Sequence, residues 1–183
     1  MEREASSTTF TLGSVLPTFT LVNVDGSIVG AEYFQGAKAY LVGFLCNHCP
    51  YVKGSEEMLV KIAKRFQPDG LKVVTINSND ASKYPEDSFD KMREKSRLMS
   101  LPYPYLYDES QDVARMFDAA CTPEFYLFDQ NRVLVYHGTI NDNPKDATRV
   151  TKDYLSDAVA AVLEGTKPVP PFVHPIGCSI KWK

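Results

Sequence analysis

The sequence predicts an α/β fold, with a mixed central sheet, helices on both faces and an N-terminal β-hairpin. Apolar strand-like runs alternate with helical patterns through the middle of the chain. One such run, residues 39–45, passes directly into a Cys-x-x-Cys pair and then into a helical pattern. A second hairpin and an amphipathic helix follow. We therefore expect a flexible segment at 1–13, one domain at 14–183 and an extended tail from about residue 166.

The composition is that of an ordinary globular protein. The chain has 183 residues, of which 44% are apolar and 23% charged, and its formal net charge is −3. This length allows one full hydrophobic core. The charge favours neither nucleic acid nor an anionic membrane, and no apolar run approaches the roughly 18 residues of a membrane span. The first residues lack the apolar core of a signal peptide, so we expect a cytoplasmic protein without nucleic-acid or membrane partners.

Strands and helices are predicted to alternate in the N-terminal half. Hydrophobic period, turn residues and capping signals place each element. The expected elements are a strand at 17–23, a turn at Asp25-Gly26, a returning strand at 27–29, a helical turn at 31–34, a buried strand at 38–45, a helix at 46–66 with Gly54 as its weak point, a strand at 71–77 and a helix at 87–99. Ser78-Asn79-Asp80 follows a strand at its carboxyl end, where α/β proteins place functional loops.

The C-terminal half is predicted to end in a hairpin and a helix. The expected elements are a short strand that residues 102–106 lead into, a helix at 111–117 capped by residues 108–110, a strand at 124–128, a turn at 129–131, an antiparallel partner at 132–138, a polar loop at 140–149 and a helix at 152–163. The proline-rich tail ends Gly177-Cys178-Ser179-Ile180-Lys181-Trp182-Lys183.

Cys46 and Cys49 form the candidate redox site. A reactive cysteine must be a thiolate, and the unpaired N–H groups at a helix start favour a negative sulfur. We therefore predict that Cys46, at the helix start, is the exposed attacking thiol. Cys49, one turn later on the same face, is predicted to be the more buried resolving thiol. Four cysteines are no disulfide scaffold, and such a pair in a reducing compartment favours catalysis or metal binding.

His48 lies between the two cysteines and is expected to tune them. It can stabilise the Cys46 thiolate and make the disulfide more oxidising, and Asn47 is grouped with it as a tuning residue. Two alternatives stay open: an inert structural pair, and a zinc or copper site formed by Cys46, His48, Cys49 and a fourth ligand. The sequence has no second Cys-x-x-Cys and no His-x-x-x-His, so we predict neither a metal nor a cofactor.

Cys121-Thr122-Pro123 is the second candidate constellation. In this topology the loop before the hairpin strand packs against the redox turn. We predict a cis-proline at Pro123, with the Thr122 backbone presented to an extended substrate; an ordinary trans turn proline is the alternative. Cys121 and Cys178 are candidate auxiliary thiols, and a buried or free cysteine is the alternative for each.

Three motifs carry a family resemblance: FLCNHCPYV at 44–52, CTPEFYLFD at 121–129 and GCSIKW at 177–182. Together they resemble the peroxiredoxin-like thioredoxin family of the AhpC/TSA group, over about residues 13–183. The resemblance implies a thioredoxin fold with the N-terminal additions of peroxiredoxins. It also implies that Cys46 stands at the position of the peroxidatic cysteine and of the first thioredoxin cysteine.

The chain departs from the sequence patterns of both peroxiredoxins and thioredoxins. Peroxiredoxins carry Pro-x-x-x-Thr-x-x-Cys, but Ala39 and Gly43 stand at the proline and threonine positions. Pro123-Glu124 stands where peroxiredoxins place an arginine. Tyr40 stands where thioredoxins bury an acid, which makes Tyr40 the third expected tuning residue. These departures favour disulfide exchange over peroxide reduction.

We therefore predict a thiol–disulfide oxidoreductase that uses Cys46 and Cys49. Its expected partners are a protein disulfide or a small thiol or peroxide substrate, and a reductant such as a thioredoxin or glutathione system. A thiol peroxidase using Cys46 is the first alternative. A non-catalytic redoxin that binds a metal or a partner is the second, and the oligomeric state stays open.

Overall fold

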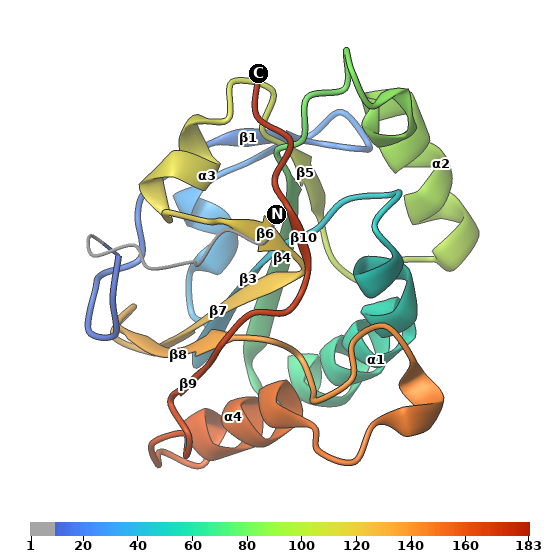
Figure 1. The fold of residues 1–183 in the computed structure, drawn as a ribbon. Coiled ribbons are helices and arrows are strands. Elements are labelled where there is room, and N and C mark those ends of the chain that lie inside the picture. Colours follow the sequence, from blue (N-terminus) through green and yellow to red (C-terminus); the bar gives the residue numbers. More distant parts are fainter. Residues whose placement is uncertain (1–9) are drawn as a thin grey trace.

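The computed structural model describes residues 10–183 and contains an eight-stranded mixed sheet (Figure 1). The strand order is β2-β1-β5-β4-β3-β7-β8-β9. β3 (Ala39–Phe44) lies in the middle, parallel to β4 (Leu71–Asn77) and antiparallel to β7 (Glu124–Asp129). The other strands are β1 (Leu21–Asn23), β2 (Ile28–Val29), β5 (Tyr105–Tyr107), β6 (Cys121–Thr122), β8 (Leu134–Gly138), β9 (Phe172–Val173) and β10 (Cys178–Ser179).

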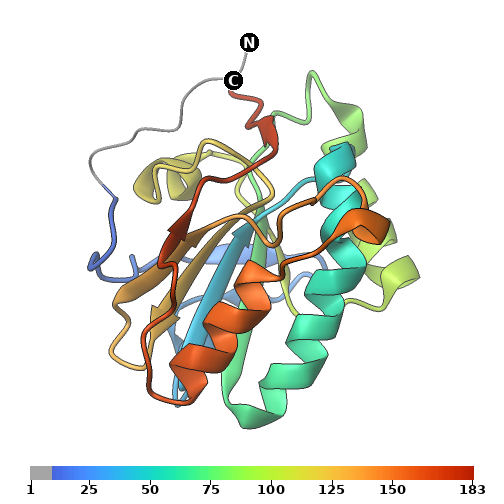
Figure 2. The same ribbon diagram turned by 60° about the horizontal axis from the view of Figure 1, so that its bottom comes forward.

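Helices cover both faces of the sheet, as the sequence predicts. They are α1 (Pro50–Phe66), α2 (Phe89–Met99), α3 (Asp112–Met116) and α4 (Tyr154–Leu163), with 3-10 turns η1 (Ala31–Phe34), η2 (Gln67–Asp69), η3 (Pro85–Asp87) and η4 (Ala147–Arg149). α1 and α4 lie side by side on one face (Figure 2). α1, α2 and α4 contribute side chains to the core of that face, and η1 and α3 to the core of the other.

The central strand divides its side chains between these two cores. Every residue of β3 is buried, which explains its continuous apolar sequence. Successive strand side chains point to opposite faces. Leu41 accordingly lies in the core under α1 and α4, whereas Tyr40 and Val42 lie in the core under α3.

Several predicted elements are present with shorter bounds. The strand predicted at 17–23 is confined to β1, which forms the predicted antiparallel hairpin with β2. The helix predicted at 46–66 begins at Pro50. The helices predicted at 87–99, 111–117 and 152–163 are α2, α3 and α4, and the first of them is preceded by η3. In the described part of the chain, no helix is both long and apolar enough to span a membrane.

Both predicted end segments contact the sheet where they are described. Residues 1–9 of the expected flexible segment lie outside the described residues. Phe10 packs on Phe117, with 5.2 Å between ring centroids, and the Gly13 N–H donates to the Leu134 carbonyl at 2.9 Å. The tail from about residue 166 adds β9 to the sheet edge beside β8 and then pairs β10 with β6.

Candidate redox-active site

Cys46 and Cys49 occupy the turn between β3 and α1. Pro50 is the first residue of α1, and a residue before proline avoids the helical conformation. Cys49 is therefore the N-cap, extended at φ −66° and ψ 126°. The predicted helix start at Cys46 is wrong, and Cys46 lies in the preceding loop. The helix dipole acts within the first turn, so it acts on Cys49 more than on Cys46.

Neither thiol of the pair is exposed. Cys46 and Cys49 are each 0% exposed, which contradicts the prediction of an exposed Cys46. Both thiols contact Thr122: the Cys46 Sγ is 3.3 Å from the Thr122 Oγ1, and the Cys49 Sγ donates to the Thr122 carbonyl at 3.2 Å. None of the four cysteines forms a disulfide in this structure.

The hydrogen bond between the two thiols separates their pKa values. The pKa of Cys49 is lowered to about 4, chiefly by this bond and also by hydrogen bonding with Cys178, against the effect of burial. The same bond is the largest cause that raises the pKa of Cys46, followed by burial and by the negative charge of Asp87. The hydrogen bond therefore favours ionisation of one thiol of the pair and opposes ionisation of both.

His48 is held against a buried carboxylate. Its Nδ1 is 2.6 Å from the Asp87 Oδ2, and its ring stacks on Tyr84 with centroids 5.4 Å apart. Asp87 is completely buried and also accepts from the backbone N–H of Asn47 at 2.6 Å. No spacing in the sequence marks Asp87, which stands 39 residues after His48. The predicted tuning residue thus has a partner that sequence reasoning missed.

Asn47 and Tyr40 do not act on the thiols by contact. The Asn47 side chain donates to the Glu86 carbonyl at 2.8 Å and accepts from the Tyr105 hydroxyl at 3.0 Å, so it fixes the loop. Tyr40 lies in the core on the face opposite the dithiol, with its ring 5.6 Å from that of Phe34. This placement contradicts the expected tuning role of Tyr40, because β3 ends at Phe44 and both cysteines of the dithiol lie in the core on the other face of the sheet.

Two further connections surround the site. The Asn79 side chain, in the predicted functional loop, donates to the Asp87 Oδ2 at 2.7 Å and accepts from the Lys181 N–H at 2.8 Å. A buried ion pair joins Glu56 of α1 to Lys95 of α2, and Lys95 also donates to the Cys46 carbonyl at 3.1 Å. The loop that contains Asn79 was predicted to be functional because it follows the carboxyl end of a strand. No sequence pattern predicted the ion pair between Glu56 and Lys95.

Thr122 and Pro123 face the dithiol as predicted, but the expected docking edge is occupied. The Thr122–Pro123 peptide bond is cis. Thr122 pairs with Cys178, and Cys121 pairs with Ser179, in the antiparallel ladder of β6 and β10. The chain's own tail therefore takes the backbone position that we expected an extended substrate to take.

The donor atoms of three residues could hold a metal ion. Those of Cys46, His48 and Asp87 all lie within 4.8 Å of one another. Asp87 takes the place in this cluster that the sequence assigned to Cys49. A mixed sulfur, nitrogen and oxygen set of this kind is compatible with zinc.

The central strand of the sheet leads into a dithiol that lies beside a cis-proline loop. This arrangement places the chain in the thioredoxin-like α/β class. A model of the family described as Redoxin matches residues 11–155, and the chain belongs to that family.

Two solved structures are similar to this chain over nearly its full length. The chain is 40% identical to a hypothetical protein from Sinorhizobium meliloti 1021, with a TM-score of 0.90 and 96% of each chain covered. It is 46% identical to an uncharacterized conserved protein from Geobacillus kaustophilus, with a TM-score of 0.88 and coverage of 96% of this chain and 94% of that one.

A curated plant protein is a more distant relative. The chain is 24% identical over 131 residues to "Peroxiredoxin Q, chloroplastic" from Oryza sativa subsp. japonica, which covers 68% of this chain. The match spans 57% of the length of that relative. These similarities support thiol-based redox activity of the Redoxin family.

Proposed function

We propose that this protein is a thiol–disulfide oxidoreductase in which Cys46 attacks and Cys49 resolves. The observation that carries the proposal is the contact of both sulfurs with Thr122, at 3.3 Å for Cys46 and 3.2 Å for Cys49. These contacts bring the two thiols together beside the cis-proline loop.

The reaction proceeds by two exchanges. The Cys46 thiolate attacks one sulfur of a substrate disulfide, forms a mixed disulfide and releases the other substrate sulfur as a thiolate. Cys49 then attacks the Cys46 sulfur, forms the Cys46–Cys49 disulfide and releases the second substrate thiolate. Two electrons pass from the protein to the substrate. A reductant of the thioredoxin or glutathione class restores the dithiol.

A proton shift between the sulfurs activates Cys46. The hydrogen bond between the sulfurs favours the proton on Cys46 and the charge on Cys49, as the directions of their pKa shifts indicate. Transfer of the proton to Cys49 creates the attacking thiolate. Thr122 supports that state, because its carbonyl accepts from the Cys49 S–H and its hydroxyl is placed to donate to the Cys46 thiolate.

His48 tunes this step through Asp87. The Asp87 carboxylate disfavours a negative Cys46, because like charges in a buried site repel. The His48 Nδ1 lies 2.6 Å from that carboxylate and fixes its position beside Cys46. His48 is therefore a positioning residue, and Cys46 is the group that touches the substrate.

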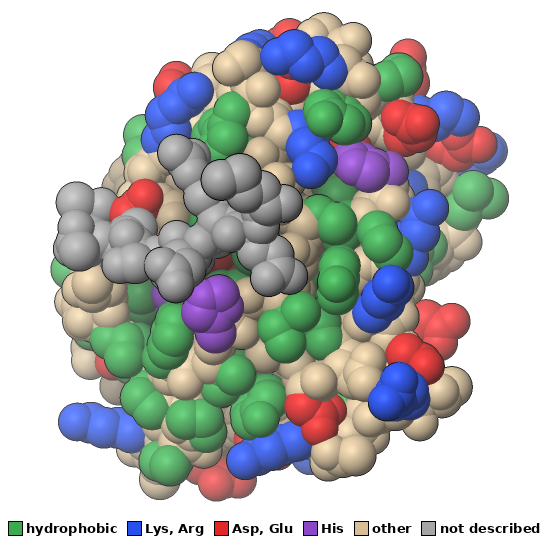
Figure 3. All heavy atoms as spheres, in the orientation of Figure 1, with side chains coloured by type: hydrophobic (Ala, Val, Ile, Leu, Met, Phe, Trp, Pro, Cys, Tyr) green, Lys and Arg blue, Asp and Glu red, His purple; other side chains and the backbone are tan. Residues whose placement is uncertain are grey.

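Access to the dithiol requires a local movement, because both thiols are buried. The tail lies over this part of the molecule (Figure 1), and hydrophobic side chains gather over it and the beginning of α1 (Figure 3). Apolar surface next to a redox site suits contact with the apolar segments of a protein or peptide disulfide.

Peroxide reduction is the second candidate function. Similarity to a protein named peroxiredoxin Q supports it, and so does the Thr122 hydroxyl beside Cys46. In that reaction Cys46 attacks a peroxide oxygen and becomes a sulfenic acid, with release of water or an alcohol. Cys49 then displaces water to form the same Cys46–Cys49 disulfide.

The test compares both activities in one set of variants. Reduction of insulin disulfides by dithiothreitol is measured with the wild type, Cys46→Ser and Cys121→Ser, alongside consumption of hydrogen peroxide. We expect disulfide reduction in the wild type and in Cys121→Ser, its loss in Cys46→Ser, and no catalysed peroxide consumption. Saturable peroxide turnover that depends on Cys46, without disulfide reduction, would establish the second candidate instead.

A further inference from the structure

The tail strand β10 places one cysteine on the dithiol side of its ladder. Residues directly opposite in an antiparallel pair direct their side chains to the same side. Cys178 is opposite Thr122, whose hydroxyl contacts Cys46. Ser179 is opposite Cys121, so Cys121 faces the other side. The register therefore places Cys178 and Cys121 on opposite faces of the β6–β10 ladder.

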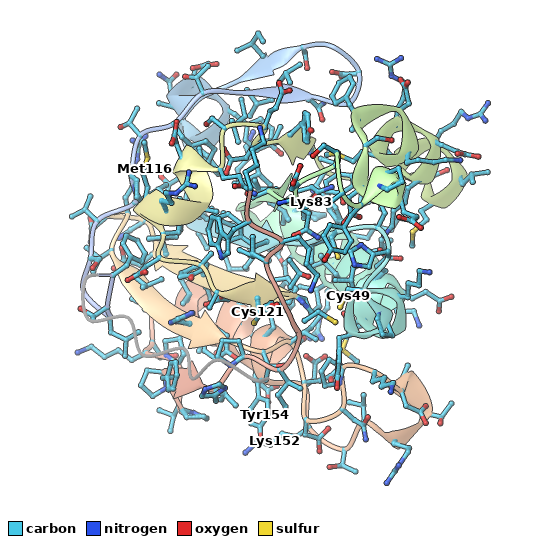
Figure 4. All side chains as sticks on the ribbon, turned by 45° about the horizontal axis from the view of Figure 1, so that its top comes forward. Cys49, Lys83, Met116, Cys121, Lys152 and Tyr154 are labelled. Carbon is cyan, nitrogen blue, oxygen red and sulfur yellow. The ribbon has the colours of Figure 1, made fainter. Side chains whose placement is uncertain are left out.

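Contacts around Cys49 agree with this register. Cys178 packs against the core cluster that contains both dithiol sulfurs, and it interacts with Cys49 by hydrogen bonding. Gly177 lies so close to Thr122 that an added Cβ would stand 2.2 Å from the Thr122 carbonyl oxygen, the atom that the Cys49 Sγ contacts. Cys49 and Cys121 lie on opposite sides of the tail (Figure 4).

Backbone and side-chain hydrogen bonds hold the tail in this place. The Ile180 N–H donates to the Ala120 carbonyl at 3.0 Å, and the buried Gln111 donates to the Lys181 carbonyl at 2.9 Å. The Lys183 N–H donates to the Gln111 Oε1 at 3.0 Å. These contacts hold the tail just after β10, and the pairing of β9 with β8 holds it before β10, so Cys178 has a fixed position.

We propose that Cys178 is a third redox thiol, which takes over the disulfide of the buried pair and carries it to the protein surface. This inference rests on the proposed function, because it begins with the Cys46–Cys49 disulfide. The Cys178 thiolate attacks the Cys49 sulfur, the Cys46–Cys49 bond breaks and a Cys49–Cys178 bond forms. Cys46 leaves as a thiolate. The exchange moves the disulfide without net oxidation or reduction.

The state of Cys49 controls the pKa of Cys178. In the reduced protein the pKa of Cys178 is raised to about 11, first by burial and then by its hydrogen bond with Cys49 and the charge of that thiolate. The two effects of Cys49 end when Cys49 enters a disulfide. Lys181 and Lys145, which lower the pKa of Cys178, remain. Cys178 therefore gains thiolate character when its target disulfide has formed.

Cys178 is more exposed than the two cysteines of the dithiol, so a reductant can reach it more easily. Cys46 and Cys49 are fully buried, whereas Cys178 is partly exposed. A thiol reductant that cannot reach the Cys46–Cys49 bond can attack the Cys178 sulfur of a Cys49–Cys178 bond. That attack releases Cys49 and restores the dithiol after the reductant's second thiol resolves the mixed disulfide. The tail thus links a buried substrate site to a surface site for the reductant.

Mapping of disulfides during oxidation tests this proposal. The reduced full-length protein is mixed with one equivalent of glutathione disulfide, quenched with acid at intervals, alkylated, digested and examined by mass spectrometry. We expect the wild type and Cys121→Ser to form Cys46–Cys49 first and Cys49–Cys178 afterwards. Cys178→Ser should stop at Cys46–Cys49. Reduction of its oxidised form by a thioredoxin should be at least about tenfold slower than in the wild type.

Gly177→Ala gives a second test that leaves every cysteine in place. Its new Cβ displaces the tail from Thr122, so Cys49–Cys178 should fall well below the wild-type yield while Cys46–Cys49 still forms. The proposal is overturned if Cys49–Cys178 is absent in the wild type at every time although Cys46–Cys49 forms, or if Cys121 takes the disulfide. Failure of Cys46–Cys49 to form even in Cys178→Ser would instead contradict the proposed function itself.

Discussion

A single shared proton distinguishes the chemistry of Cys46 and Cys49. Burial alone raises the pKa of both thiols, since it penalises the thiolate. The hydrogen bond between them then favours the charge on Cys49 and the proton on Cys46. Cys46 thus becomes reactive when Cys49 takes up the proton, and the Thr122 carbonyl stands where Cys49 can donate.

Removal of Cys49 should make Cys46 more acidic. In Cys49→Ala the largest cause that raises the pKa of Cys46 is lost, so the pKa of Cys46 falls and its thiolate appears at lower pH. Thiolate absorbance near 240 nm as a function of pH, with iodoacetamide mapping of the labelled peptide, measures this. In Cys46→Ala the opposite shift is expected, and the pKa of Cys49 should rise from about 4. An unchanged profile in both variants would contradict the shared proton.

Asp87→Asn should also ease the ionisation of Cys46. The variant removes a like charge beside the sulfur but keeps similar size. The Cys46 Sγ and an Asp87 carboxylate oxygen lie within 4.8 Å of each other. A charge this close shifts the pKa of a neighbouring group by about 1–3. The alkylation of Cys46 should therefore begin at lower pH than in the wild type, as peptide mapping measures. Asp90→Asn is the matched control, because its carboxylate is on α2 and its side chain is 93% exposed. Equal effects of the two substitutions would argue against the role of Asp87.

At the level of elements, the close approach of α1 to the loop at 140–149 sets the position of the site. Gly54 was expected to be a weak point in the helix. Instead it is a contact point: an added Cβ would stand 2.5 Å from the carbonyl oxygens of Pro144 and Lys145. The glycine lets the loop lie directly on the helix that follows the dithiol.

Gly54→Ala should therefore destabilise the protein. Helix propensity alone favours alanine by about 1 kcal/mol. Overpacking against backbone costs about 1–3 kcal/mol, and we expect it to outweigh the propensity gain. Urea unfolding measures the difference in free energy. Glu57→Ala, at an exposed position of the same helix, should stay within about 0.5 kcal/mol of the wild type. A more stable Gly54→Ala protein would contradict the close contact.

The ion pair between α1 and α2 makes a second prediction at this scale. Burial raises the pKa of Glu56, and the charge of Lys95 opposes that rise. Lys95→Met leaves a buried carboxylate unpaired, at a cost of about 3–5 kcal/mol in unfolding free energy at neutral pH. Because a carboxyl with a raised pKa is favoured in its protonated form, the loss should shrink as the pH falls toward 5. Denaturant unfolding at the two pH values measures this, and Glu56→Gln with Lys95→Met should recover part of the stability.

For the whole molecule, the strands and the class of fold could be predicted because hydrophobic period and turn residues are local signals. The start of α1 was wrong because the apolar period runs through the turn, while the preference of the residue before Pro50 decides the boundary. Asp87, Lys95 and the position of Cys178 could not be predicted, since each depends on contacts between segments far apart in the chain. Tyr40 was assigned because thioredoxins bury an acid six residues before the first cysteine, but here β3 ends at Phe44 and Cys46 lies in the core on the other face of the sheet.

The central claim is that Cys46 attacks disulfides and Cys49 resolves them. It is tested most directly by mixing reduced Cys49→Ser protein with a disulfide-linked peptide and locating the adduct by mass spectrometry. We expect one stable peptide adduct, on Cys46, and in the wild type only a transient one that gives way to the Cys46–Cys49 disulfide. Absence of an adduct on Cys46, or an equally stable adduct there in the wild type, would contradict it.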